Sequence, residues 1–199
     1  PAQQRAVVHV MMRHDDDRLF RWRRRLLLMT HPHVDLKIAK GTIIGPRFDL
    51  WMPARGTLHI GNQCEFRRDA IFEVGPGARV TMDDQVIFTA AALVQISTEL
   101  TIGRRAVFGQ SVMIADGNHK FRDHTKHLLD QGYDFRPITI GDNAIVTSKC
   151  TILNSIGEGA VIGANSVVTQ PIPPYCLAVG APARVVDYFG PEDMRPEGI

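Results

Sequence analysis

One polar segment of the chain, residues 115–137, contains three histidines: His119, His124 and His127. The first of them closes the short motif DGNH at residues 116–119. Histidine has an unperturbed pKa of about 6.5, so a neutral imidazole can remove a proton from a reacting group near neutral pH. This segment is therefore the first candidate for acid–base chemistry. We predict His119 as the general base and expect the other two histidines to be solvated loop residues.

The cysteines predict neither a metal site nor a disulfide framework. They are odd in number, widely spaced and free of any CxxC pair: Cys64, Cys150 and Cys176. This usage is typical of a reducing compartment. With no secretory signal evident, it favours a cytoplasmic protein that needs no metal.

A six-residue spacing of apolar side chains predicts the elements that position the histidine segment. It recurs in three runs: Ile102, Phe108 and Ile114; Ile140, Val146 and Ile152; Ile156, Ile162 and Val168. A period of six fits neither an α-helix nor a flat strand. Three short strands joined by corners satisfy it, with Gly, Asn or Asp at the corners. We expect coils of about 18 residues, stacked roughly six times into an all-β parallel β-helix.

Two segments interrupt this repeat. Residues 13–29 predict an amphipathic helix, whose apolar side chains recur at three- and four-residue steps: Leu19, Trp22, Leu26 and Met29. Residues 115–137 have no six-residue register, although both flanks do, which predicts a projecting loop. The expected organisation is a helical segment at 1–36, a β-helix domain at 37–187 that carries the loop, and a tail at 188–199.

Charge is concentrated in the predicted helix. The chain has a net charge of +2, and six arginines fall within residues 13–25. The rest of the chain is close to neutral, which argues against nucleic-acid binding. We weigh two interpretations of the basic helix: it contacts an anionic membrane surface, or it caps the end of the β-helix.

The C-terminal motifs resemble a known family, the hexapeptide-repeat acyltransferases, and within it the galactoside, maltose and polysaccharide O-acetyltransferase branch. The resemblance covers residues 56–187 and is carried by IGANSVVT (162–169), PIPPYCLAVGAPAR (171–184) and the DGNH loop. It implies a left-handed parallel β-helix and a homotrimer. It also implies that acetyl-CoA, the acyl donor, binds in the groove between neighbouring prisms.

The resemblance also implies roles for individual residues. His119 matches the family's loop histidine, and Asp116 and Asn118 are candidates for binding the saccharide acceptor. The expected contacts to CoA are Ser148 and Ala164 along the pantetheine arm, with Thr169 and Arg184 near the adenosine end. An arginine suits the last position because a guanidinium can hold phosphate oxygens through two hydrogen bonds.

This chain departs from the family pattern at three places. Ile145-Val146-Thr147 replaces a common Trp-Ile-Gly, Gln170 stands where relatives usually carry Lys, and Asn154-Ser155 shortens a Pro-Gly-Val step. All three departures touch the expected CoA groove.

The leading hypothesis is O-acetylation of a sugar or glycoconjugate by direct attack. One alternative is N-acetylation of an amino sugar. Another is a γ-class carbonic-anhydrase-like metalloprotein, since His119 and His124 are five apart, although Asp83 and Asp84 stand where a further histidine is needed. A catalytically idle binding scaffold is the remaining hypothesis.

Overall fold

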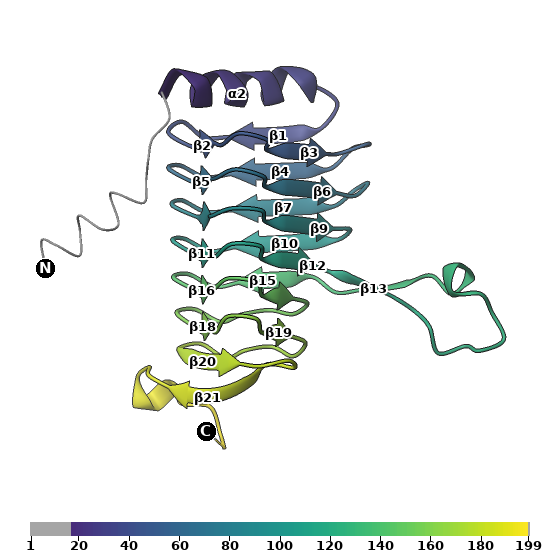
Figure 1. Cartoon of the computed structure of the whole chain (residues 1–199), viewed down its shortest axis with the longest axis vertical. Helices are drawn as coiled ribbons and strands as arrows, with labels where there is room; N and C mark the ends of the chain where they lie inside the picture. The colour runs from purple at the N-terminus through teal and green to yellow at the C-terminus, as the bar shows by residue number, and fades with distance from the viewer. Residues whose placement is uncertain (1–16, 199) are drawn as a thin grey trace, which may run out of the picture.

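The computed structural model of the protein describes residues 17–198, which form a three-sided prism of stacked coils (Figure 1). The first sheet contains β1 (Asp35–Ile38), β4 (Thr57–Ile60), β7 (Arg79–Met82), β10 (Glu99–Ile102) and β15 (Ile138–Ile140). The second contains β2 (Ile43–Ile44), β5 (Glu65–Phe66), β8 (Ile87–Phe88), β11 (Val107–Phe108), β16 (Ile145–Val146), β18 (Val161–Ile162), β20 (Cys176–Val179) and β21 (Arg184–Tyr188). The third contains β3 (Asp49–Trp51), β6 (Ile71–Val74), β9 (Leu93–Ile96), β12 (Met113–Ala115), β17 (Thr151–Ile152) and β19 (Val167–Val168). The predicted three-sided parallel β-helix is confirmed.

The sequence predicts coils of one length, about 18 residues, but the structure contains three lengths. The first coils have 22 residues, the coil before residues 116–137 has 20, since Leu93 pairs with Met113, and the later coils have 16. In the early coils the paired residues Glu73 and Gln95 are separated by 22 residues. After the hairpin segment, Thr139 and Ser155 hold equivalent places in adjacent coils and are separated by 16 residues. The early coils are longer because their first and third sides are mostly four-residue strands rather than the two-residue strands of the later coils.

The core follows the change in coil length. The early coils bury a stack of phenyl rings, in which Phe88 lies 5.6 Å from Phe66 and 4.3 Å from Phe108 between ring centroids. All three rings are fully buried. Between Ile138 and Ala183 the later coils bury only smaller side chains, such as Ile152 and Ile162. The six-residue runs in the sequence are mostly Ile and Val, and they do not reveal this change from phenyl rings to aliphatic side chains.

Corners are formed by residues with left-handed backbone conformations. One column of corners contains five side chains with φ between +55° and +63°: Gln63, Gln85, Arg105, Asn143 and Tyr175. Four of these residues are neither Gly, Asn nor Asp. The stacked coils therefore impose this conformation on residues that rarely adopt it.

An N-terminal helix, α2 (Asp17–Thr30), covers the first coil (Figure 1). Phe20 is buried, Leu27 packs against the core, and the Arg24 guanidinium donates two hydrogen bonds to the Ile38 carbonyl, at 2.8 and 2.6 Å. The helix that the sequence predicts is confirmed, although residues 13–16 of the predicted span lie outside the described residues. Within the described range, no helix is long and apolar enough to span a membrane.

At the other end, β21 pairs antiparallel with β20 and closes the edge of the second sheet. Tyr188 is buried there, and its hydroxyl donates to the Pro191 carbonyl. A short 3-10 helix, η2 (Glu192–Met194), follows. The strand β21 therefore runs across residues 187–188, where the sequence predicts the tail to begin.

Candidate functional site

Residues 116–137 leave the prism as a projecting hairpin (Figure 1). Its strands are β13 (Gly117–His119) and β14 (Tyr133–Phe135), which pair antiparallel, and η1 (Leu128–Asp130) lies near its tip. The hairpin connects β12 of the third sheet to β15 of the first, so it replaces one corner of a coil. A Cβ on Gly117 would lie 2.5 Å from the Phe135 ring, so a larger residue at this crossing would require that ring to move.

His119 stands at the end of β13 with its ring packed against Tyr133, the ring centroids 4.3 Å apart and tilted by 38°. Its Nδ1 atom is buried and has no hydrogen-bond partner among the described residues. The side chain borders two cavities. One lies along the third sheet and the other lies within the hairpin itself.

The cavity along the third sheet has a volume of about 340 Å³. Its wall includes outward-facing side chains from successive coils, because Trp51 pairs with Glu73 and Glu73 with Gln95 in the strand register. The Gln95 amide donates a 2.6 Å hydrogen bond to the Glu73 carboxylate, and Trp51 is 55% exposed beside them. An acid–amide pair next to an exposed aromatic ring offers hydrogen bonds and a flat apolar face to one ligand.

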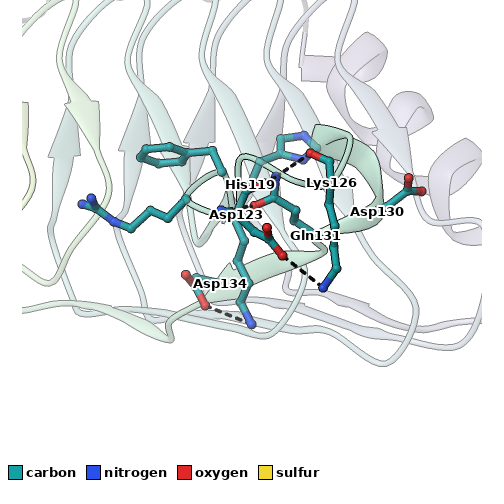
Figure 2. Close-up of a pocket in the computed structure, with 9 residues that line it drawn as sticks. His119, Asp123, Lys126, Asp130, Gln131 and Asp134 are labelled. Carbon is teal, nitrogen blue, oxygen red and sulfur yellow. Dashed lines mark hydrogen bonds and ion pairs between the residues drawn. The ribbon is translucent and has the colours of Figure 1, made fainter.

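A second cavity, of about 370 Å³, lies within the hairpin (Figure 2). Its walls are held by polar contacts: the Gln131 amide donates to the carbonyls of Asp123 and Lys126, and the Lys126 ammonium lies 3.1 Å from the Asp123 carboxylate. Hydrogen bonds from Thr125, first of all from its hydroxyl, lower the pKa of Asp123. The hairpin is therefore an ordered wall whose Asp123 carboxylate stays ionised.

Asp116 does not have the contact that would orient the imidazole. Its carboxylate is buried and accepts hydrogen bonds from the Ser97 N–H, the Thr98 N–H and the Thr98 hydroxyl, the last two at 2.6 Å. No hydrogen bond joins it to His119 within residues 17–198. The carboxylate therefore fixes the base of the hairpin to the preceding coil. It also lines two of the cavities beside the hairpin, and its contact with an acceptor stays a prediction.

Asn118 and His119 border different cavities. Asn118 is exposed and lines a smaller cavity, of about 280 Å³, together with Thr169 and Gln170. His119 is not part of that lining. Adjacent residues of a strand point to opposite faces, which separates the two side chains. The structure thus brings Asn118 to Thr169, one of the predicted CoA contacts, rather than to the predicted base.

Two other predicted CoA contacts share one edge of the prism. Ser148 and Ala164 occupy equivalent corners of adjacent coils, between the second and third sheets, and the Asn165 N–H donates to the Ser148 carbonyl. The Ser148 hydroxyl accepts from the Gln110 N–H of the coil before. The hairpin with His119 lies at a different corner, between the third and first sheets. Within one chain, these contacts and the predicted base therefore lie on different edges.

Arg184 lies at the C-terminal end of the prism, at the start of β21. Its side chain is exposed, and one guanidinium nitrogen donates to the Ala183 carbonyl at 3.0 Å. In the second sheet, β16, β18 and β20 lie between the coil that carries the hairpin and β21, so Arg184 is apart from His119.

The remaining histidines of the hairpin are exposed. His127 accepts a hydrogen bond from the Leu129 N–H and caps η1, while His124 is solvated. Within residues 17–198, no group of three or more His, Cys, Asp or Glu side chains is placed to hold a metal ion.

Sequence reasoning missed four residues of this site: Trp51, Glu73, Gln95 and Tyr133. The first three lie outside the recognised motifs, and only the strand register of the long coils marks them as neighbours. Tyr133 is paired with His119 by the hairpin register, which the motif DGNH does not reveal.

In sequence, the chain is similar to known acetyltransferases. No protein-family model matches it. It is 28% identical over 169 residues to a probable acetyltransferase of Mycobacterium tuberculosis, covering 83% of this chain and 55% of that protein. It is 35% identical over 98 residues to the galactoside O-acetyltransferase of Escherichia coli, covering 48% of this chain and 47% of that protein. The chain thus spans about half the length of these curated relatives.

Solved structures give the same fold. A hexapeptide-repeat acetyltransferase of Vibrio cholerae, complexed with acetyl coenzyme A, aligns with a TM-score of 0.54 and 24% identity over 76% of this chain and 72% of that one. An N-acyltransferase of Bacillus cereus, in complex with dTDP and 3-hydroxybutyryl-CoA, aligns with a TM-score of 0.62 and 15% identity over 82% and 87%.

Proposed function

We propose that this chain is a member of the hexapeptide-repeat acetyltransferases, to which it is similar in sequence and fold. In this proposal it transfers an acetyl group from acetyl-CoA to a hydroxyl of a sugar or glycoconjugate. The observation that carries the proposal is the position of His119. It borders a cavity whose wall carries the Glu73–Gln95 pair and the exposed ring of Trp51. Such a wall suits a hydroxylated ring, which has polar edges and an apolar face.

In the proposed reaction the acceptor hydroxyl attacks the thioester carbonyl directly. Because Nδ1 of His119 is buried, we assign proton removal to Nε2. The new C–O bond forms as the imidazole takes the hydroxyl proton. Collapse of the tetrahedral intermediate then breaks the C–S bond, and the imidazolium returns the proton to the departing thiolate of CoA. No covalent enzyme intermediate is needed.

We further propose that the working enzyme is a homotrimer. This proposal is supported by the separation of the two predicted half-sites, since Ser148 and Ala164 lie on a different edge of the prism from His119. Packing of prisms side by side would bring the hairpin of one copy to the CoA edge of its neighbour. In this arrangement no single copy holds a complete site.

The first experiment is acetyl-CoA turnover, followed by thiol release, across a panel of glycans and amino sugars. His119→Ala is expected to lower kcat by roughly 10²–10⁴ and to leave the KM for acetyl-CoA nearly unchanged. His124→Ala is the matched control, because that histidine is exposed on the same hairpin. Wild-type turnover by the His119 variant would reassign the base. Turnover with amino sugars alone would make the protein an N-acetyltransferase.

A mixing experiment tests the shared site. Ala164→Trp places a bulky ring on an exposed corner of the proposed CoA edge, and His119→Ala removes the proposed base. Each variant alone is expected to turn over acetyl-CoA far more slowly than the wild type. Mixed trimers should recover part of the activity, because some sites then pair an intact edge with an intact hairpin. Failure to recover activity in trimers shown to be mixed would contradict a site formed between copies.

A further inference from the structure

The outer side of α2 carries an apolar stripe that the prism does not use. We define the α2 stripe as four side chains that are 41–77% exposed: Leu19, Trp22, Leu26 and Met29. They recur at intervals of three and four residues, so they line one side of the helix. An exposed apolar surface beside polar residues is typical of a site that contacts a partner or a membrane.

Capping of the prism does not require the α2 stripe. The opposite side of the helix makes that contact, through the buried Phe20, the half-buried Leu27 and the two hydrogen bonds from Arg24 to the Ile38 carbonyl. The two faces of α2 thus have separate tasks. The helix lies across the end of the prism as the outermost element there, so a flat surface can approach it (Figure 1).

Two arginines adjoin the stripe along its length. Arg21 and Arg25 are exposed, and neither forms an ion pair or a hydrogen bond with another described residue. At about 100° per residue, Arg25 lies about 40° around the helix from Met29, and Arg21 lies about 40° further. The outward half of α2 is therefore apolar on one side and cationic on the other.

We propose that α2 docks the protein on an anionic lipid bilayer. Trp22, Leu26 and Met29 enter the headgroup region, while Arg21 and Arg25 contact lipid phosphates. Tryptophan is suited to the membrane interface, and each surface arginine adds attraction to an anionic leaflet. This combination favours a bilayer as the partner, because the α2 stripe suits the apolar boundary of the headgroup region and the two arginines suit the lipid phosphates.

A second copy of the chain is a poorer occupant of this face. If the outward faces of α2 from two copies packed against each other, Arg21 and Arg25 of both copies would surround one interface. Like charges facing each other oppose association. The docking proposal concerns a face remote from His119 and does not depend on the proposed reaction.

The first test uses the tryptophan of the stripe as its own reporter. The chain contains two tryptophans, so Trp51→Phe leaves Trp22 as the only one. Emission is recorded with vesicles of phosphatidylcholine alone and of phosphatidylcholine mixed with phosphatidylglycerol. A blue shift with the mixed vesicles, weakened by added salt, supports docking. An unchanged spectrum overturns the proposal, as does emission that is already blue and inaccessible to iodide before vesicles are added.

The second test measures cosedimentation with the same anionic vesicles. Arg21→Glu/Arg25→Glu is expected to weaken partitioning at least about tenfold, and Trp22→Ala is also expected to weaken it. The matched controls are Arg55→Glu/Arg79→Glu and Trp51→Ala, which change exposed residues of the same types on the sides of the prism. Circular dichroism confirms that each variant is folded. Equal loss of binding in variants and controls would contradict a site on α2.

Discussion

The coils before the hairpin and the coils after it enclose their cores with different amounts of chain. In the early coils Ile43 pairs with Glu65 and Glu65 with Ile87, whereas in the later coils Ile145 already pairs with Val161. A four-residue strand such as β4 turns two side chains inward, Leu58 and Ile60, whereas a two-residue strand such as β18 turns only Ile162 inward.

A longer perimeter encloses a wider interior, and close packing requires that volume to be filled. Phenyl rings fill the long coils, while β-branched and smaller side chains fill the short ones. Perimeter and side-chain volume therefore change together. The hairpin that carries His119 leaves the prism where the long and the short coils meet.

The largest loss of free energy of unfolding should follow the removal of a buried phenyl ring from the long coils. Phe88→Ala is expected to lower the free energy of unfolding by about 3–5 kcal/mol, because the wide coil leaves a cavity between two stacked rings. Urea denaturation measures the loss. Phe121→Ala, on the hairpin with its ring 67% exposed, should stay within about 0.5 kcal/mol of the wild type. A small effect at Phe88 would mean that the long coils collapse to a narrower form.

The boundary between the regions is tested at the base of the hairpin. Asp116→Asn replaces one carboxylate oxygen by an amide that cannot accept from the Ser97 and Thr98 donors. We expect a loss of about 1.5–3 kcal/mol, together with faster amide exchange in residues 116–137. The control is Asp134→Asn, whose side chain is 75% exposed. Unchanged exchange in the hairpin would show that the carboxylate does not hold it.

The short coils are tested by the opposite change in volume. Ile162→Phe is expected to cost about 1–3 kcal/mol of stability, because a narrow coil has no room for a ring. Val161→Phe adds the same ring on the outward side of the same strand and should cost less. Urea denaturation of both variants measures their free energies of unfolding and shows which one loses more stability. Equal stabilities would indicate that the narrow core can expand.

The smallest expected effect is a difference in acid sensitivity at the corners of the long coils. Hydrogen bonds from Asn62, first from its backbone N–H, lower the pKa of Asp84, and hydrogen bonds from Arg47 lower the pKa of Asp69. A carboxyl whose folded pKa is lowered stabilises the fold above its unfolded pKa, and that contribution is lost as pH falls through the folded pKa.

The protection factors of residues 60–86, which compare amide exchange with that of the unfolded chain at the same pH, should therefore fall below about pH 4, where these carboxyls begin to take up protons. Asp84→Asn is the control, since it should weaken this pH dependence. Protection factors that are equally pH-dependent in the variant would assign the effect to other groups.

Much of the fold was predictable because the inward residues keep a six-residue spacing where strands are short. Ile140, Val146 and Ile152 define three sides of a coil, and the structure buries all three. The length of the early coils was not predictable in the same way. In a side with two inward residues, such as Leu58 and Ile60, inward and outward residues alternate as in any strand. This pattern does not predict a wider coil.

The helix and the site show a second limit of sequence patterns. The spacing of Leu19, Trp22, Leu26 and Met29 predicts an apolar stripe, but periodicity does not say which neighbour the stripe faces. Phe20 and Leu27 make the contact with the prism instead. His119 was identified by its motif, whereas Trp51 reaches the same cavity only through the register of strands far apart in sequence.

The closure of the second sheet by β21 has a consequence for the behaviour of the protein at high concentration. A stack of parallel strands ends in unpaired N–H and C=O groups, which are a template for adding another chain. Because β21 runs antiparallel to β20, it pairs with this row of groups on β20. The free edge of β21 does not continue the parallel register of the stack. Truncation of the chain before residue 184 would expose the row, and the truncated protein would then be prone to grow into fibres.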